Sequence, residues 1–128
     1  MREQEDIVRV LFIEDDQAVA EMYRIKLELD GYAVEMAPDG ETALRLAADN
    51  PPDIVFLDIR LPKIDGLSVL ARLRGDDRTK SLPVVIFSNL SEAELVQKGL
   101  KLGALEHLVK SQATPAQMAA SIPGWLKP

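Results

Sequence analysis

The stretch Asp53-Ile54-Val55-Phe56-Leu57-Asp58 decides the fold class of this 128-residue chain. Its centre, residues 54–57, is apolar at every position, which is typical of a parallel strand that is covered on both faces of its sheet. A second run of this kind, Val84-Val85-Ile86-Phe87, follows later in the chain. Two such strands separated by helical sequence predict an α/β protein with a parallel sheet.

The alternation of short β-branched runs and amphipathic stretches continues along the chain. We predict strands over 7–13, 32–37, 53–58, 83–88 and 105–109, and helices over 18–29, 41–48, 67–73 and 92–102. The first helix carries an apolar residue at every third or fourth position, and this stripe is expected to be buried: Ala18, Met22, Ile25 and Leu29. Successive βα units predict a doubly wound parallel sheet with helices on both faces, in a single domain over residues 1–128.

Capping and breaking residues set the predicted helix boundaries. Asp16 is expected to cap the first helix, and Ser91 is expected to cap the fourth. Asp65-Gly66 forms a turn before the third helix, and Thr114-Pro115 starts a fifth helical segment. Pro123-Gly124 is expected to break or kink that segment after about two turns, because proline lacks a backbone donor.

Composition excludes several classes of protein. The chain has no cysteine, so disulfides, thiolate zinc sites and cysteine nucleophiles are absent. A net charge of −6 opposes direct binding of nucleic acid, which depends on cationic groups. The apolar runs are too short to span a bilayer, and the acidic N-terminus is unlike a secretory signal. We therefore expect a cytoplasmic protein.

Polar side chains follow four of the five predicted strands at their carboxyl ends: Glu14 and Asp15, Asp58, Ser88, and Lys110. Ligands of open parallel sheets bind beyond these ends, so the residues are expected to converge. The second strand ends at Ala37-Pro38 without such a group, as expected for an edge strand.

Three carboxylates at one edge of a sheet repel one another, and a divalent cation relieves the repulsion. Mg²⁺ prefers oxygen ligands and keeps waters that a phosphoryl oxygen can replace. Asp58 is then a candidate nucleophile that accepts a phosphoryl group to form an aspartyl phosphate. Lys110, the Ser88 hydroxyl and the cation would neutralise the phosphoryl oxygens.

Four segments resemble the signature segments of the bacterial response-regulator receiver family: Phe12-Ile13-Glu14-Asp15-Asp16, Phe56 to Gly66, Val85-Ile86-Phe87-Ser88 and Leu108-Val109-Lys110. The resemblance covers nearly the whole chain. Within the family, the chain is most similar in type to the stand-alone receivers of chemotaxis. The resemblance implies a flavodoxin-like (βα)5 sheet of order 2-1-3-4-5. It also implies a two-component phosphorelay, in which a histidine kinase or histidine phosphotransfer protein phosphorylates Asp58.

The resemblance also implies a metal site. Asp15 and Asp58, with the backbone carbonyl of Arg60, would hold Mg²⁺ or Mn²⁺, and Glu14 would act through water. Ser88 would contact the phosphoryl group and Lys110 would pair with it.

His107, the only histidine, lies three residues before Lys110, where this family often has an aromatic residue that changes rotamer in the switch. The other interpretation is a half-exposed strand residue without a switch role. As the minor alternatives, Ser88 could cap a turn, and Lys110 could be a solvated lysine at the end of a strand. Ser111 follows Lys110 where the family usually has proline. Trp125 is expected either to cover the edge of the core or to form a contact.

Two functions from different classes remain. The first is a phosphorelay receiver, a signalling switch with at most self-catalysed phosphorylation and dephosphorylation rather than an enzyme. The second is a receiver-like interaction module that acts without phosphorylation. A flavin-binding protein or enzyme is less consistent with the sequence, because the loop after the first strand is acidic rather than a Gly-rich phosphate cradle. No output domain follows Pro128, so we expect a downstream protein partner, a homodimer through the face of helix four, strand five and helix five, or a longer parent protein.

Overall fold

The structure, a computed structural model, describes residues 7–127 apart from the side chain of Leu90. Five parallel strands form one sheet in the order β2-β1-β3-β4-β5. They are β1 (Arg9–Ile13), β2 (Ala33–Ala37), β3 (Ile54–Leu57), β4 (Val84–Ser88) and β5 (Glu106–Val109). The strand order 2-1-3-4-5 and the parallel α/β fold expected from the sequence are therefore confirmed.

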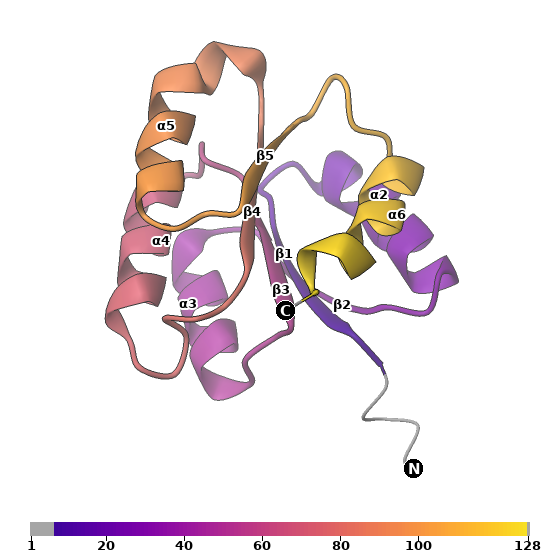
Figure 1. The fold of residues 1–128 in the computed structure, drawn as a ribbon, viewed down its shortest axis with the longest axis horizontal. Helices are drawn as coiled ribbons and strands as arrows, with labels where there is room; N and C mark the ends of the chain where they lie inside the picture. Colours follow the sequence, from indigo (N-terminus) through magenta and orange to yellow (C-terminus); the bar gives the residue numbers. More distant parts are fainter. Residues whose placement is uncertain (1–6, 128) are drawn as a thin grey trace.

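Helices cover both faces of this sheet (Figure 1). Helices α2 (Gln17–Leu29) and α6 (Pro115–Trp125) lie on one face. The other face is covered by α3 (Gly40–Asp49), α4 (Gly66–Gly75) and α5 (Ala93–Lys101), and a short 3-10 turn, η1 (Leu90–Glu92), precedes α5. Within residues 7–127, no helix has both the length and the apolar character needed to cross a membrane.

Alternation along the buried strands divides the core into two halves. In β1, Leu11 and Ile13 pack toward α3, α4 and α5, whereas Val10 and Phe12 pack toward α2 and α6. The register aligns Ile13 of β1 with Leu57 of β3. The residues that follow these two, which are the ones that carry carboxylates, therefore leave the sheet side by side.

The predicted buried stripe of the first helix is wrong. All four of its residues are exposed, Met22 and Ile25 to 51% and Leu29 to 77%. A second set at helical spacing is buried instead: Ala20, Tyr23 and Leu27. This face is buried because the Tyr23 ring stacks on Phe12 at 5.7 Å and the Tyr23 hydroxyl donates to the carbonyl of Ala113. Periodicity alone did not distinguish the two sets.

The predicted break at Pro123-Gly124 is also wrong, because α6 continues to Trp125. Pro123 lies in the last turn, where its missing N–H removes one helical hydrogen bond. The next donor is unaffected, since the Leu126 N–H donates to the Ile122 carbonyl at 3.1 Å. One lost bond near a helix end is tolerated when the buried face of the helix packs on a core.

Trp125 at the end of α6 covers the edge of the core. Its ring packs edge-on against Phe56 with the centroids 5.7 Å apart. Its indole N–H donates to Glu106 Oε1 at 3.2 Å. Of the two expectations for Trp125, the structure supports the covering of the core edge.

Most of the predicted caps are present. The Asp16 carboxylate accepts from the first turn of α2, and Thr114 and Gln117 form a reciprocal capping box on α6. The predicted Ser91 cap is wrong, because Ser91 lies inside η1 and α5 begins after Glu92. Glu92, the residue before α5, makes no capping hydrogen bond with its side chain.

Candidate functional site

The carboxyl ends of the strands surround a hollow of about 350 Å³. It contains every predicted metal and phosphoryl residue: Glu14, Asp15, Asp58, Arg60, Ser88 and Lys110. β1 positions the first two, β3 the next two, β4 the serine and β5 the lysine. The convergence expected from the strand ends is therefore observed.

Lys110 is the central cation of this hollow. Its Nζ lies 2.6 Å from Glu14 Oε1 and donates to Asp58 Oδ2 at 3.0 Å. Burial lowers the pKa of Lys110, but the contacts with Glu14 and Asp58 outweigh burial and raise it overall. Lys110 is therefore charged and is not the solvated lysine of the alternative interpretation.

Hydrogen bonds hold both the backbone and the side chain of Asp58. Its own N–H donates to the Ile13 carbonyl at 3.0 Å, and the Arg60 N–H donates to Asp58 Oδ1 at 2.9 Å. Gly66 at the start of α4 fits closely against this segment, since a Cβ there would lie 2.5 Å from the Asp58 carbonyl oxygen. The carboxylate is thus fixed, with one oxygen toward Lys110 and the other bound by the following loop.

Glu14 is a buried carboxylate with an unusual ionisation. Burial raises its pKa to about 7, opposed by Lys110 and reinforced by the charge of Asp58. Its Oε2 accepts from the Asp16 N–H at 3.1 Å. Its Oε1 is close to Lys110 but lacks hydrogen-bond geometry, and it has no other partner among the described residues. A buried acceptor in this state is suited to one more donor, such as a metal-bound water.

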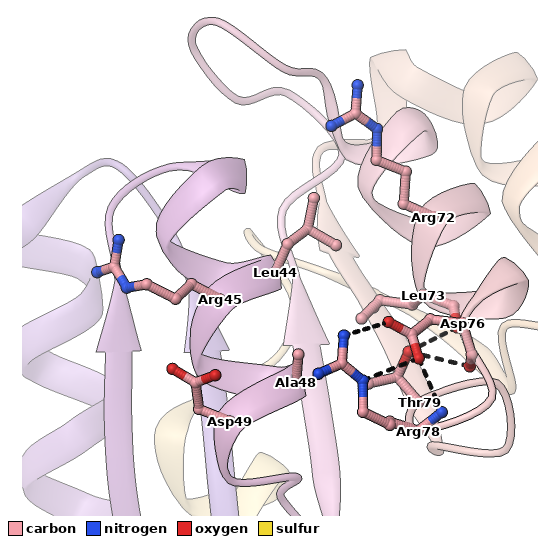
Figure 2. A pocket seen from close by; sticks show the side chains of 9 residues that line it. All are labelled: Leu44, Arg45, Ala48, Asp49, Arg72, Leu73, Asp76, Arg78 and Thr79. Atoms are coloured by element: carbon pink, nitrogen blue, oxygen red, sulfur yellow. Dashed lines mark hydrogen bonds and ion pairs between the residues drawn. The ribbon is translucent and has the colours of Figure 1, made fainter.

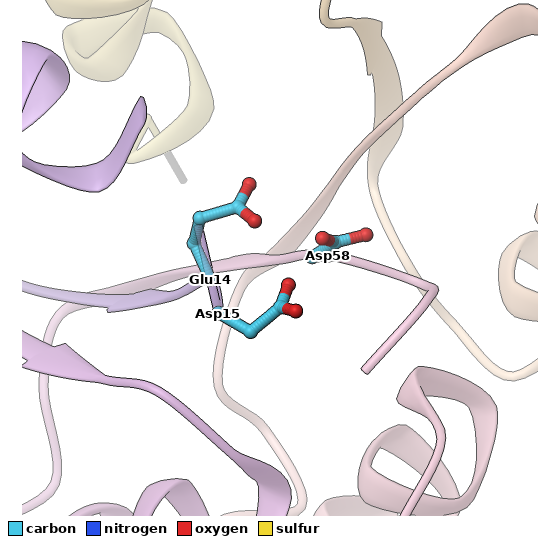
Figure 3. Close-up of side chains that lie close together, drawn as sticks. All are labelled: Glu14, Asp15 and Asp58. Atoms are coloured by element: carbon cyan, nitrogen blue, oxygen red, sulfur yellow. The ribbon is translucent and has the colours of Figure 1, made fainter. Parts of the chain in front are cut away.

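Glu14, Asp15 and Asp58 form one acidic cluster (Figure 3). Each offers a carboxylate oxygen, and these oxygens lie within 4.8 Å of one another. Glu14 and Asp58 are buried, while Asp15 is exposed. All the donors are oxygens, and Lys110 alone does not balance three carboxylates. The cluster therefore fits a hard divalent cation such as Mg²⁺.

Ser88 at the end of β4 is buried, at 1% exposure, and is bonded to His107 of β5. The Ser88 hydroxyl oxygen lies 3.0 Å from His107 Nε2, which is also 3.3 Å from the Ser88 carbonyl oxygen. His107 is half-buried. The sequence placed His107 near the switch, but it did not reveal this direct contact.

Arg60 and Glu92 form a contact that the sequence analysis missed. The Arg60 Nε donates to Glu92 Oε1 at 2.7 Å, and Glu92 is buried at the end of η1. Glu92 lines the hollow, although the sequence suggested only a role at the start of a helix. No local pattern reveals the pair, because it depends on how η1 brings Glu92 beside the loop after β3.

A second hollow, of about 420 Å³, lies between the C-terminal ends of α3 and α4, away from the acidic cluster. Figure 2 shows that Arg78 turns back to Asp76 there, while Arg45 and Arg72 extend away from this pair. The ion pair of Arg78 with Asp76 is 2.8 Å long. The hydrogen bonds from Arg78 lower the pKa of Asp76 to about 2. These charges neutralise each other, and the hollow contains none of the predicted site residues.

A parallel sheet of this order, with an acidic cluster and a lysine at its carboxyl edge, defines the class of phosphorelay receivers. The sequence matches the model of the response regulator receiver domain over residues 10–122, and the chain belongs to this family. It is a receiver domain of phosphorelay signalling.

The chain is similar to curated response regulators. It is 40% identical over 102 residues to the DNA-binding dual master transcriptional regulator RpaA of Synechocystis, covering 80% of this chain and 42% of RpaA. It is 39% identical over 114 residues to the response regulator MprA of Mycobacterium tuberculosis, covering 88% of this chain and 48% of MprA. The chain thus spans less than half the length of these two relatives.

Solved structures agree with the fold. The Vibrio cholerae chemotaxis response regulator CheY4 superposes with a TM-score of 0.85 at 27% identity, covering 94% of this chain and 99% of CheY4. The receiver domain of the Francisella response regulator 1452 superposes with a TM-score of 0.83 at 30% identity, covering 93% and 96% of the two chains.

Proposed function

We propose that Asp58 accepts a phosphoryl group from a histidine kinase or a histidine phosphotransfer protein in a reaction that requires Mg²⁺ or Mn²⁺. One observation carries the proposal. The buried Asp58 carboxylate has Lys110 Nζ at 3.0 Å and shares an acidic cluster with Glu14 and Asp15. A carboxylate fixed between a cationic side chain and a cation site has the surroundings that an attacking nucleophile of phosphoryl transfer requires.

In this proposal, Asp58, Asp15 and the backbone carbonyl of Arg60 hold the cation, and Glu14 acts through a bound water. The cation, when bound, neutralises oxygens of the phosphoryl group. An Asp58 oxygen bonds to phosphorus while the bond from phosphorus to the donor imidazole nitrogen breaks, and the freed imidazole takes a proton from solvent. Lys110 then transfers its contact from the Asp58 carboxylate to a phosphoryl oxygen, since positive charge follows the added negative charge.

Ser88 lies in the same hollow and is proposed to donate to a second phosphoryl oxygen. His107, bonded to Ser88, is proposed as its partner in the switch. Removing the phosphoryl group needs only attack by water on the acyl phosphate. The protein therefore acts as a switch with at most self-catalysed phosphorylation and dephosphorylation, and we expect it to work in the cytoplasm.

The exposed apolar side chains of α2 suggest where the phosphodonor docks. Met22, Ile25 and Leu29 are half or more exposed and lie on one face of this helix. α2 begins at Gln17, two residues after Asp15, so the N-terminal end of this helix is the end nearest the acidic cluster. We propose that a helix of the phosphodonor packs on this stripe, because an apolar stripe at this spacing matches another helix.

A different surface is proposed for output. His107 lines a hollow on β5 and α6 together with Gln117 and Ser121. A movement at Ser88 therefore reaches the face of α5, β5 and α6, where a downstream protein or a second copy of the chain would bind. The net charge of −6 makes direct binding of nucleic acid by this domain unfavourable. A protein partner is therefore proposed for output.

Intact-mass measurement with Mg²⁺ and acetyl phosphate tests the proposal. We expect one added phosphoryl group on the wild type and none on Asp58→Asn. Asp77→Asn is the matched control, because the Asp77 side chain is 93% exposed away from the hollow. A wild type that gains no phosphoryl group, or an Asp58→Asn variant that gains as much, would support the alternative of a receiver-like module that acts without phosphorylation. Ser111 and His107 are the departures from the family pattern that favour this alternative.

A further inference from the structure

The Ser88 hydroxyl is buried at the end of β4. A hydroxyl carries one donor proton and two acceptor lone pairs. Among the described residues, its one hydrogen-bond partner is His107 Nε2, at 3.0 Å. If the Ser88 hydroxyl donates in this bond, its proton points to His107. If His107 Nε2 donates, the Ser88 proton is left for another acceptor.

The neighbouring carbonyl favours one direction of this bond. His107 Nε2 is also 3.3 Å from the Ser88 carbonyl oxygen, which can only accept. If Nε2 lacked a proton, its lone pair would face the lone pairs of that carbonyl. A proton on Nε2 would instead be shared between the carbonyl and the hydroxyl oxygen. The ring nitrogen that carries the proton is set by such partners.

The strand register brings His107 close to Ser88. Ile86 of β4 is aligned with His107 of β5, and Ser88 is aligned with Val109. His107 and Ser88 are thus diagonal neighbours on the same face of adjacent strands. The imidazole reaches Ser88 without a change in the backbone.

We infer that His107 is a positioning residue for phosphoryl transfer, which donates its Nε2 proton to the Ser88 hydroxyl oxygen and leaves the Ser88 proton free for a phosphoryl oxygen. The inference rests on the proposed function of Asp58. The opposite bond, from Ser88 to an unprotonated Nε2, would direct the Ser88 proton toward β5 and away from the hollow. With an apolar side chain at position 107, no hydrogen bond from that position would orient the Ser88 hydroxyl.

Nitrogen NMR of the full chain tests the direction of the bond without any phosphodonor. The chain contains one histidine, so ¹⁵N labelling gives a single imidazole spin system. We expect a proton on Nε2. An imidazole that is protonated on Nδ1 alone would overturn the inference. Ser88→Ala is the matched variant, and it should shift the Nε2 signal more than the Nδ1 signal.

Phosphorylation kinetics with acetyl phosphate and Mg²⁺ test the consequence. His107→Leu lacks the donor and should slow phosphorylation of Asp58 about fivefold, the effect of one lost hydrogen bond. His107→Gln should restore the rate to within about twofold of the wild type, because its amide N–H lies near the position of Nε2. In a Ser88→Ala background, His107→Leu should have no further effect.

The outcomes separate this inference from the proposed function. Wild type that gains no phosphoryl group contradicts the role of Asp58, and the NMR result then still decides the direction of the bond. If the wild type is phosphorylated at Asp58 and His107→Leu is phosphorylated equally fast, the role of His107 is contradicted and the role of Asp58 stands. Melting of each variant, followed by circular dichroism, distinguishes a folded protein that is phosphorylated slowly from an unfolded protein. If His107→Gln is phosphorylated as slowly as His107→Leu, the role of His107 is purely structural.

Discussion

Lys110 Nζ lies 2.6 Å from Glu14 Oε1, so an ion pair connects the end of β5 with the end of β1 across the two strands between them. The same ammonium contacts Asp58, so one positive charge serves two buried carboxylates. A bound cation would compete with Lys110 for the two carboxylates. A phosphoryl group on Asp58 would attract Lys110. Several measurable properties depend on this arrangement.

Magnesium should stabilise the folded protein. A ligand that binds only the native state raises the free energy of unfolding of the protein. At a Mg²⁺ concentration ten times the dissociation constant, this contribution is about 1.4 kcal/mol. For a domain of this size we expect the melting temperature to rise by about 3–6 °C. Differential scanning calorimetry with sodium chloride at matched ionic strength as the control measures this. Asp58→Asn should weaken the effect, and no rise in the wild type would count against a metal site in the acidic cluster.

Glu14 should make the metal-free protein less stable as the pH rises from about 4.5 to about 7. Its pKa is raised from 4.5 to about 7 in the folded state, so the folded protein binds more protons than the unfolded chain in this interval. The free energy of unfolding therefore falls with pH there, by roughly 2–3 kcal/mol. Urea titrations in EDTA should show this slope. Glu14→Gln should flatten it, and an equally steep slope in that variant would assign the effect to another group.

Replacing Lys110 should have opposite effects on stability and on metal binding. Lys110→Met leaves Glu14 and Asp58 without their cation, which should cost about 1–3 kcal/mol of unfolding free energy in EDTA. The same variant should bind Mg²⁺ more tightly, because it no longer has a competing positive charge in the hollow. Calorimetric titration measures the affinity. Lys80→Met, at an exposed pair with Asp77, is the control and should change neither property.

Gly66 should be intolerant of any side chain. A Cβ at this position would lie 2.5 Å from the Asp58 carbonyl oxygen and 2.6 Å from the Ile59 Cα, so the backbone beside the acceptor must shift. We expect Gly66→Ala to cost about 1–3 kcal/mol in urea unfolding. Gly75→Ala is the control in the same helix, because a Cβ there meets nothing within 4 Å. It should be neutral or slightly stabilising, and equal losses in both variants would mean that helix propensity rather than contact decides.

The exposed stripe of α2 should matter only for a protein phosphodonor. Ile25→Glu should slow transfer from a phosphorylated histidine phosphotransfer protein by about tenfold or more, because it places a charge in an apolar contact. Its rate with acetyl phosphate should equal that of the wild type. Leu105→Glu, also about half exposed but in the loop before β5, is the control. A docking site elsewhere would be indicated if both variants accepted phosphate from the protein donor at the wild-type rate.

The sequence predicted the sheet well because its signals are local. Continuous apolar runs identify β3 and β4 without knowledge of their neighbours; Asp58 follows β3 at once, and Ser88 is the last residue of β4. The residues Asp58, Ser88 and Lys110 could be brought together in advance because parallel strands place their carboxyl ends at one edge. The strand order itself came from the family resemblance.

The failures arise where two elements must be placed relative to each other. Periodicity in α2 allowed two faces, and the face with Tyr23 is favoured by Phe12 and by the Ala113 carbonyl, which belong to other parts of the chain. The bond between Ser88 and His107 depends on a register that the sequence does not specify. The pair of Arg60 and Glu92 depends on η1, which has no distinctive pattern.

The contact of Trp125 with Phe56 gives the molecule an intrinsic optical sensor. The chain contains a single tryptophan, and its ring lies against the strand that leads, two residues later, to Asp58. Its fluorescence emission therefore comes from one known place, where the last helix meets the central strand. Stopped-flow experiments can follow any rearrangement there in unlabelled protein, and a phosphorylation that left the emission unchanged would show that the response does not reach the contact of α6 with β3.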